Sequence, residues 1–192
     1  RFGTNHKWGT FPSVSLAWRI SDEAFMESTT SWLNNLKLRA GYGVTGNQAG
    51  IGEYKSLAVL SADGASYYDA ASGTWKKSYV QAQNVNPNLK WESTVSWNAG
   101  LDFTLLKGRL NGSLDVYKKI TKDLLVSREL PNLIGYSTVM SNIGEVQNHG
   151  VELSLNSTNI KMKNLTWRTS FSFAYNKNKI THLYGIMEDI KD

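Results

Sequence analysis

A long stretch in the middle of the chain, residues 89–126, alternates between apolar and polar side chains. Its first half places apolar residues at odd positions, namely Val95, Trp97, Ala99, Leu101, Phe103 and Leu105. The even positions carry polar residues, namely Glu92, Thr94, Ser96, Asn98, Asp102 and Thr104. A period of two predicts a strand with two unlike faces. The Lys107-Gly108 pair is typical of a tight turn, and alternation resumes after it, so the stretch predicts one long hairpin.

The arms of this hairpin are longer than ordinary strands. Each arm runs for roughly 16 residues, whereas strands of globular domains usually end after about 5 to 6. A strand that crosses a bilayer at a tilt needs about 9 to 11 residues, and large barrels continue their strands beyond the membrane. We therefore predict an all-β fold whose antiparallel strands form part of a large transmembrane β-barrel.

The same alternation predicts four further strands, which makes six with the two arms. These strands cover residues 13–20, 35–44, 151–156 and 165–176. Residues 21–34 break the alternation, and Ser21 followed by Asp22 and Glu23 is typical of a helix N-terminus. About one or two helical turns are expected there.

The connections between the strands alternate in length. The short ones are residues 21–34, 107–108 and 160–164, and the long ones are residues 45–89 and 127–148. Outer-membrane barrels join their strands by short periplasmic turns and long extracellular loops. We therefore expect the Lys107-Gly108 turn to face the periplasm and the long loops, including Pro131, Gly135 and Gly144, to face outside.

One position breaks the pattern in the second arm. Lys118 falls on the apolar parity after Val116, and Tyr117 falls on the polar one. Either a β-bulge shifts the register at this point, or the strand has already left the hydrocarbon.

Composition and charge narrow the function classes. The chain has 192 residues with seven Trp, nine Tyr and six Phe, many of them on strands that otherwise carry small polar residues. The 21 basic and 16 acidic residues give a net charge of +5 that is spread along the chain. A nucleic-acid partner is not expected, because a binding face would concentrate Lys and Arg. The absence of cysteine excludes a disulfide frame and a thiolate metal site.

No motif supports catalysis, a metal or a cofactor. Gly41, Gly43 and Gly46 match a dinucleotide fingerprint, but loop-forming residues follow them where the fingerprint needs a helix. We expect the first two of these glycines to keep a strand slim on its inner face. The three histidines, His6, His149 and His182, have no partner at ligand spacing, and no nucleophile elbow is present.

Several long motifs in the chain together resemble those of the SusC/RagA family of TonB-linked outer-membrane transporters of Bacteroidetes. They are FPSVSLAWRISDEAFM at 11–26, LKLRAGYGVTGNQ at 36–48, NPNLKWE at 86–92, YKKITKDLL at 117–125, NIGEVQNHGVELSL at 142–155 and SFSFAYNKNKI at 170–180. The resemblance covers nearly the whole chain and is weakest at residues 49–85.

The resemblance implies a barrel of about 22 strands with an N-terminal plug, energised by TonB and capped outside by a SusD-like surface lipoprotein. It also implies substrates that are oligosaccharides or oligopeptides too large for porins. Residues 1–192 are then expected to be an internal part of the barrel, with the plug and the TonB-interacting segment elsewhere.

Two groups of residues are candidates for functional contacts. The first would point into the lumen and comprises Lys37, Arg39, Glu92, Asp102, Asp115, Glu152 and Arg168. We favour the interpretation that these are wall charges that satisfy one another or a plug, over direct substrate contact. The second is an aromatic loop cluster that could stack on sugars or pack under a partner, namely Tyr67, Tyr68 and Trp75.

Two alternatives remain open at this stage. A water-soluble β-sandwich, such as a carbohydrate-binding or adhesive surface domain, would bury the apolar faces against a second sheet. It predicts burial of Trp18, Trp97, Trp167 and Phe171. A passive porin would share the barrel and lack a plug.

Overall fold

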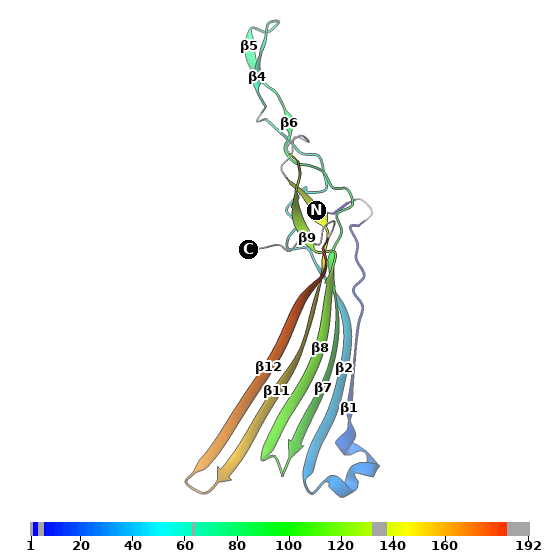
Figure 1. Ribbon diagram of the computed structural model, residues 1–192, viewed down its shortest axis with the longest axis vertical. Coiled ribbons are helices and arrows are strands. Elements are labelled where there is room, and N and C mark those ends of the chain that lie inside the picture. Colours follow the sequence, from blue (N-terminus) through cyan, green and yellow to red (C-terminus); the bar gives the residue numbers. More distant parts are fainter. Residues whose placement is uncertain (1, 4–5, 63, 132–137, 184–192) are drawn as a thin grey trace.

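The computed structural model describes residues 2–3, 6–62, 64–131 and 138–183. Its main feature is one open sheet of six antiparallel strands in the order β1-β2-β7-β8-β11-β12 (Figure 1). The strands are β1 Ser13–Arg19, β2 Leu33–Asn47, β7 Glu92–Leu105, β8 Leu110–Lys122, β11 Glu145–Lys161 and β12 Thr166–His182. The predicted six-stranded antiparallel arrangement is confirmed, with the central arms 14 and 13 residues long.

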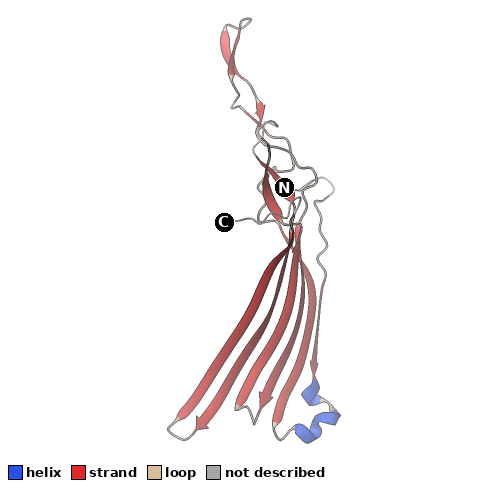
Figure 2. Cartoon of the chain, viewed as in Figure 1, coloured by secondary structure: helices blue, strands red, loops and turns tan. Residues whose placement is uncertain are grey.

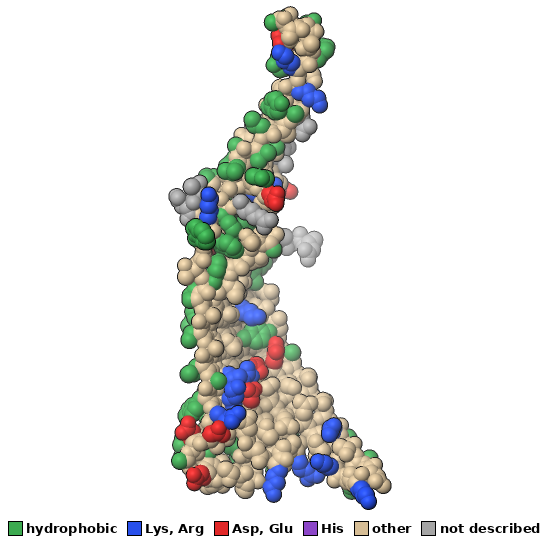
Figure 3. Space-filling view, turned by 180° about the vertical axis from the view of Figure 1, so that it is seen from behind, with side chains coloured by type: hydrophobic (Ala, Val, Ile, Leu, Met, Phe, Trp, Pro, Cys, Tyr) green, Lys and Arg blue, Asp and Glu red, His purple; other side chains and the backbone are tan. Residues whose placement is uncertain are grey.

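The register gives the sheet one apolar face and one polar face. A row across the apolar face runs through Leu16, Ala40, Ala99, Val116, Val151 and Tyr175. The adjacent row on the polar face runs through Ala17, Arg39, Gly100, Asp115, Glu152 and Ala174. The view in Figure 3 shows basic and acidic side chains gathered over the lower half of the sheet. The period of two in the sequence therefore gives the sheet two surfaces of different polarity.

The short connections lie together at one end of the sheet, which we call the turn end. The predicted turn at Lys107 and Gly108 is confirmed, and both residues have positive φ, 56° and 82°. The first connection holds two short 3₁₀ helices, η1 Ile20–Asp22 and η2 Ala24–Thr29 (Figure 2). The expectation that Ser21 caps a helix is wrong, because η1 already begins at Ile20, and its N-cap residue, Arg19, makes no side-chain cap hydrogen bond.

β8 passes Lys118 without a bulge. Its pairing with β7 and with β11 is continuous from one end to the other. The register shifts of the main sheet fall elsewhere, between Leu33 and Asn35, between Glu145 and Val146, and between Thr158 and Ile160. The bulge interpretation of Lys118 is therefore wrong, and Lys118 stays on the apolar face while Tyr117 stays on the polar one.

The long connections meet at the opposite end, which we call the loop end, and they contain more structure than the sequence predicted. The predicted loop at 127–148 is wrong at both limits: β9 Leu125–Glu129 pairs with β10 Thr138–Asn142, and β11 begins at Glu145. Gly135 lies outside the described residues. The predicted loop at 45–89 begins late, since β2 continues to Asn47. Beyond it, two small two-stranded sheets form an arm. In one, β3 Leu60–Ser61 pairs with β6 Val80–Gln81, and in the other β4 Ser66–Asp69 pairs with β5 Thr74–Lys77.

The buried core of the described residues is small and lies mainly at the loop end, while Leu33, 5% exposed, is buried at the turn end. Leu89 is fully buried and Ile51 is 3% exposed. Trp91 beside them stacks on Phe2 at a centroid distance of 4.5 Å and meets Phe11 edge-on at 5.4 Å. This core fixes the base of the arm on the sheet.

The apolar face of the sheet is open to its surroundings. The four aromatic side chains that a β-sandwich would bury are 46 to 56% exposed, namely Trp18, Trp97, Trp167 and Phe171. The burial that the sandwich alternative predicts is therefore absent from the described part of the chain. No described helix is long and apolar enough to cross a membrane.

The face assignment can be tested on β12. Phe171 lies on the apolar face opposite Leu155, and Ser172 lies on the polar face opposite Ser154. In the complete barrel, Phe171→Arg should cost about 2 to 4 kcal/mol of folding free energy near mid-membrane, because it places a guanidinium in hydrocarbon. Ser172→Arg, the matched control, should cost much less. Folding free energies in lipid vesicles measure both, and equal costs would contradict the assignment.

Candidate functional site

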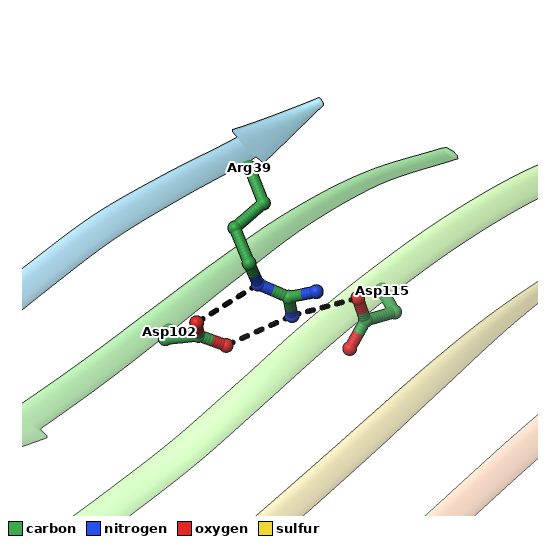
Figure 4. A network of polar contacts seen from close by, with 3 residues as sticks. All are labelled: Arg39, Asp102 and Asp115. Carbon is green, nitrogen blue, oxygen red and sulfur yellow. Dashed lines mark hydrogen bonds and ion pairs between the residues drawn. The ribbon is translucent and has the colours of Figure 1, made fainter. Parts of the chain in front are cut away.

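Three of the predicted lumen residues form a charged network across three strands of the polar face. Arg39 on β2 donates from Nε to Asp102 Oδ2 and from Nη2 to Asp102 Oδ1, both at 2.8 Å (Figure 4). Nη2 also donates to Asp115 Oδ1 on β8 at 2.8 Å. The side chains are 31 to 33% exposed. One guanidinium thus links β2, β7 and β8 through charge-assisted bonds in a bidentate geometry.

Gly100 makes this link possible. It stands between Arg39 and Asp115 in the row across the polar face. A Cβ built at Gly100 would lie 2.5 Å from Asp115 Oδ1 and 2.7 Å from Arg39 Nη2. Since real Cβ atoms do not approach so closely, any other residue at this position would force the Arg39 guanidinium or the Asp115 carboxylate to shift.

The other four predicted lumen residues do not join the network. Lys37 lies opposite Asp102 and Glu152 lies opposite Asp115, while Arg168 lies opposite Thr158 nearer the turn end. None of these three forms an ion pair with a described residue. Glu92 lies at the loop end, where the Asn47 amide donates to it at 3.4 Å.

The network carries more carboxylates than cations. Arg39 is shared by two aspartates, and Glu152 faces Asp115 directly across the strand pair. Like charges in directly opposite positions are unfavourable, so water or a cation is favoured on this side of the network. The arrangement offers hydrogen bonds and charge, and this suits a hydrated wall.

A shallow hollow of about 570 Å³ lies on β1, β2 and β7 next to Arg39. Gly41 contributes to it as predicted, since a Cβ there would lie 2.4 Å from Asn98 Oδ1. Gly43 does not need to be glycine for space, because the nearest atom to a Cβ there, the Ser13 Cβ, is 3.5 Å away. Of the two glycines expected to keep the inner face of the strand free of bulk, only Gly41 has a neighbour that an added Cβ would contact too closely.

The loop aromatic candidates lie on the β4–β5 hairpin at the far end of the arm. Tyr68 and Trp75 face each other with ring centroids 5.6 Å apart, in an edge-on arrangement. Tyr67 pairs instead with Lys76, so it points to the other side of the hairpin. The structure thus brings together two of the three candidates, and all three are more than half exposed.

Asp69 closes this hairpin. Its carboxylate accepts hydrogen bonds from Ser72 Oγ at 2.7 Å and from the Ala71 N–H at 3.1 Å, and it also pairs with Lys76. The Lys76 ammonium is the main cause that holds the pKa of Asp69 below its ordinary value, and Ser72 adds to it. The Asp69 carboxylate therefore supports the hairpin above about pH 4 and less as the pH falls through the lowered pKa.

Asn142 joins the two long connections and was not a candidate from the sequence. The Lys90 N–H donates to Asn142 Oδ1 at 2.9 Å, and Asn142 Nδ2 donates to Lys90 O at 2.8 Å. The same Nδ2 reaches Asp123 O at 2.9 Å. Two of the motifs quoted above, NPNLKWE and NIGEVQNHGVELSL, meet at this point. Their joint presence in the sequence was the signal from which a contact between Lys90 and Asn142 could have been predicted.

No three described His, Asp or Glu side chains are placed to hold a metal ion. The predicted absence of a metal and of a cofactor stays a prediction.

The strand lengths, the two unlike faces and the open edges at β1 and β12 define a piece of the wall of a transmembrane β-barrel. A family model described as "TonB dependent receptor-like, beta-barrel" matches residues 1–190, and the chain belongs to this outer-membrane family. The class predicted from the sequence motifs is confirmed.

Known relatives agree with this assignment. The chain is 42% identical over 183 residues to TonB-dependent receptor P39 of Formosa agariphila, covering 95% of this chain and 17% of that protein. It is 41% identical over 189 residues to TonB-dependent receptor SusC of Bacteroides thetaiotaomicron, covering 96% of this chain and 18% of that protein. The chain thus spans less than a fifth of the length of these two relatives.

Solved structures show the same fold. The RagAB peptide importer in its "open-open" state matches with a TM-score of 0.82 at 32% identity, covering 96% of this chain and 19% of that chain. The structure of the RagAB peptide transporter matches with a TM-score of 0.81 at 32% identity, covering 97% and 20%.

The Gly100 crossing can be tested with a matched pair of glycines. Gly100→Ala should displace the Arg39 guanidinium and cost about 1 to 2 kcal/mol of folding free energy in the complete barrel, because charge-assisted bonds are lost at a partly exposed site. Gly43→Ala adds the same methyl group to the same face without a close contact and should be neutral within about 0.5 kcal/mol. Equal effects would contradict the steric role of Gly100.

The Asn142 contacts predict a local effect. Asn142→Ala should speed amide hydrogen exchange at Lys90 about tenfold or more, since it removes the acceptor of that N–H. Exchange mass spectrometry on the peptide around Lys90 measures this. Asn178→Ala, an exposed amide with no side-chain hydrogen bond in the described structure, is the control and should leave the exchange rate unchanged. Unchanged exchange in Asn142→Ala would refute the contact.

Proposed function

We propose that this chain is part of the barrel wall of a TonB-dependent outer-membrane transporter that imports oligosaccharides or oligopeptides together with a SusD-like surface lipoprotein. The observation that carries the proposal is the near-complete match of the chain to SusC and to the RagAB importer in both sequence and fold. RagAB is described as a peptide importer, and this supports peptides as one class of solute.

The polar face supplies the lumen wall in this proposal. The Arg39 carboxylate contacts favour charges that satisfy one another over charges kept free for a solute. Lys37, Glu152 and Arg168, which have no ion pair among the described residues, are the wall charges that remain open to a plug or a solute.

The arm at the loop end is the proposed contact for the lipoprotein or the solute. Its tip presents Tyr68 and Trp75 as an exposed aromatic pair far from the sheet. Aromatic rings of this kind stack on sugar rings and also pack under protein partners.

Energy dependence separates the proposal from the passive porin. Uptake of labelled oligosaccharides and oligopeptides is measured in cells that carry the complete transporter, with and without a protonophore. Loss of uptake on collapse of the proton gradient supports TonB-driven import. Unchanged uptake would favour the porin.

The proposed orientation can be tested at the arm. An epitope inserted into the turn that joins β4 to β5, residues 70–73, should bind antibody on intact cells, because the long connections face outside. An epitope at Lys107-Gly108 is the control and should be reached only after the outer membrane is permeabilised. The reverse pattern would invert the topology.

A further inference from the structure

The apolar face changes character at one row on three neighbouring strands. Toward the loop end, the row that follows Val116, Val151 and Tyr175 contains Val14, Tyr42, Trp97, Lys118, His149 and Lys177. Lys179 follows on β12 in the next row, opposite Gln147. We call Lys118, His149, Lys177 and Lys179 the basic row edge. These residues share the face of the aliphatic side chains below them, and not the lumen face.

Aromatic residues lie in this row and next to it. Tyr42 and Trp97 belong to it, with ring centroids 4.4 Å apart. On β12, Trp167 and Tyr175 bracket the apolar stretch, which at a tilt of about 40° rises about 20 Å, close to the apolar band of about 25 Å of such barrels. Because amphipathic aromatic rings sit at the membrane interface, Lys118 opposite Trp97 and Lys177 just beyond Tyr175 are placed at the level of the lipid headgroups.

The lysines of the basic row edge lack protein counter-charges in the described part of the chain. Other lysines at the loop end are paired: Lys90 lies 2.9 Å from Asp123, and Lys122 lies 3.7 Å from Glu145. Lys118, Lys177 and Lys179 form no ion pair with a described residue. Their neighbours on the same face are apolar or neutral, namely Val116, Ile120, Gln147, Val151 and Tyr175.

An anion from outside the protein would supply the counter-charge for these lysines. Lys118 and Lys177 flank His149 on the two sides of β11, and so lie about 10 Å apart at the usual spacing of strands. Two cations at this distance repel one another weakly, and an anion between them is attracted by both. An anion held at this height, next to an aliphatic surface, must belong to a molecule with both a charged headgroup and acyl chains.

We propose that the basic row edge binds the phosphate groups of a phosphorylated glycolipid in the outer leaflet, whose acyl chains lie on the apolar face of β8, β11 and β12. The proposal rests on the outer-membrane orientation proposed above. It assigns a function to Lys118, whose place on the apolar face the alternation alone did not explain. The lysines act as charge and hydrogen-bond donors to phosphate oxygens.

The test uses the complete transporter in detergent, with diphosphorylated lipid A as the probe and native mass spectrometry as the readout. The double variant Lys118→Gln with Lys177→Gln should bind the probe about tenfold or more weakly. Lys118→Arg with Lys177→Arg should bind it within about twofold of the unmodified protein, because the charge is kept. The matched control, Lys107→Gln with Lys163→Gln, removes two exposed lysines at the turn end and should change nothing.

Three outcomes would overturn the proposal. They are equal binding by the double Gln variant, equal binding of lipid A from which the phosphates have been removed, and displacement of the probe by millimolar inorganic phosphate, which would indicate a site for the free ion. The measurement needs neither transport nor orientation. A failure of proposed import shows in the uptake assay, and a failure of the topology shows in the epitope assay, so each is separable from a failure of lipid binding.

Discussion

The continuous antiparallel hydrogen-bond ladder is the constraint on which the rest of this structure depends. In a bilayer each backbone N–H and C=O must find a partner within the protein, and a sheet meets that demand only when neighbouring strands stay paired over their full length. The same ladder fixes the side-chain period at two, so a slip of one residue would move every lipid-facing side chain into the lumen. β8 keeps one register with both of its neighbours across the whole apolar band, and the three shifts fall near strand ends.

The choice of side chains is less constrained on the polar face than on the apolar face. Its side chains need water or partners but no particular shape, and charge is tolerated wherever it can be solvated or paired. The Arg39 network is about one third exposed, so its contribution to stability is modest and its effect is mainly geometric. This geometry depends on Gly100 of β7, which lies between Arg39 and Asp115 and has no side chain in the path of the guanidinium.

The sequence predicted the features that follow from periodicity and missed those that follow from distant contacts. The six strands, the tight turn at Lys107 and the two faces all derive from local alternation, which the sequence displays directly. The ends of the strands could not be predicted in this way, because polar residues on the apolar face, such as Lys118 and Gln147, continue the ladder where alternation no longer has a physical cause. Asn142 was missed for another reason: its partners, Lys90 and Asp123, lie far away in the sequence. Of the charged candidates, only those within one guanidinium's reach of each other were brought together.

The extension of the ladder beyond the membrane explains how the arm is held in place. A loop that began at the bilayer surface would have only its own contacts to orient it. Here β2, β7, β8 and β11 run on to the loop end, and the buried Leu89 and the Asn142 contacts sit directly on their ends. The stiffness of the paired strands is therefore passed to the base of the arm. The outer surface of the same strands changes at the row of Lys118: toward the turn end it is apolar, and toward the loop end it carries charge.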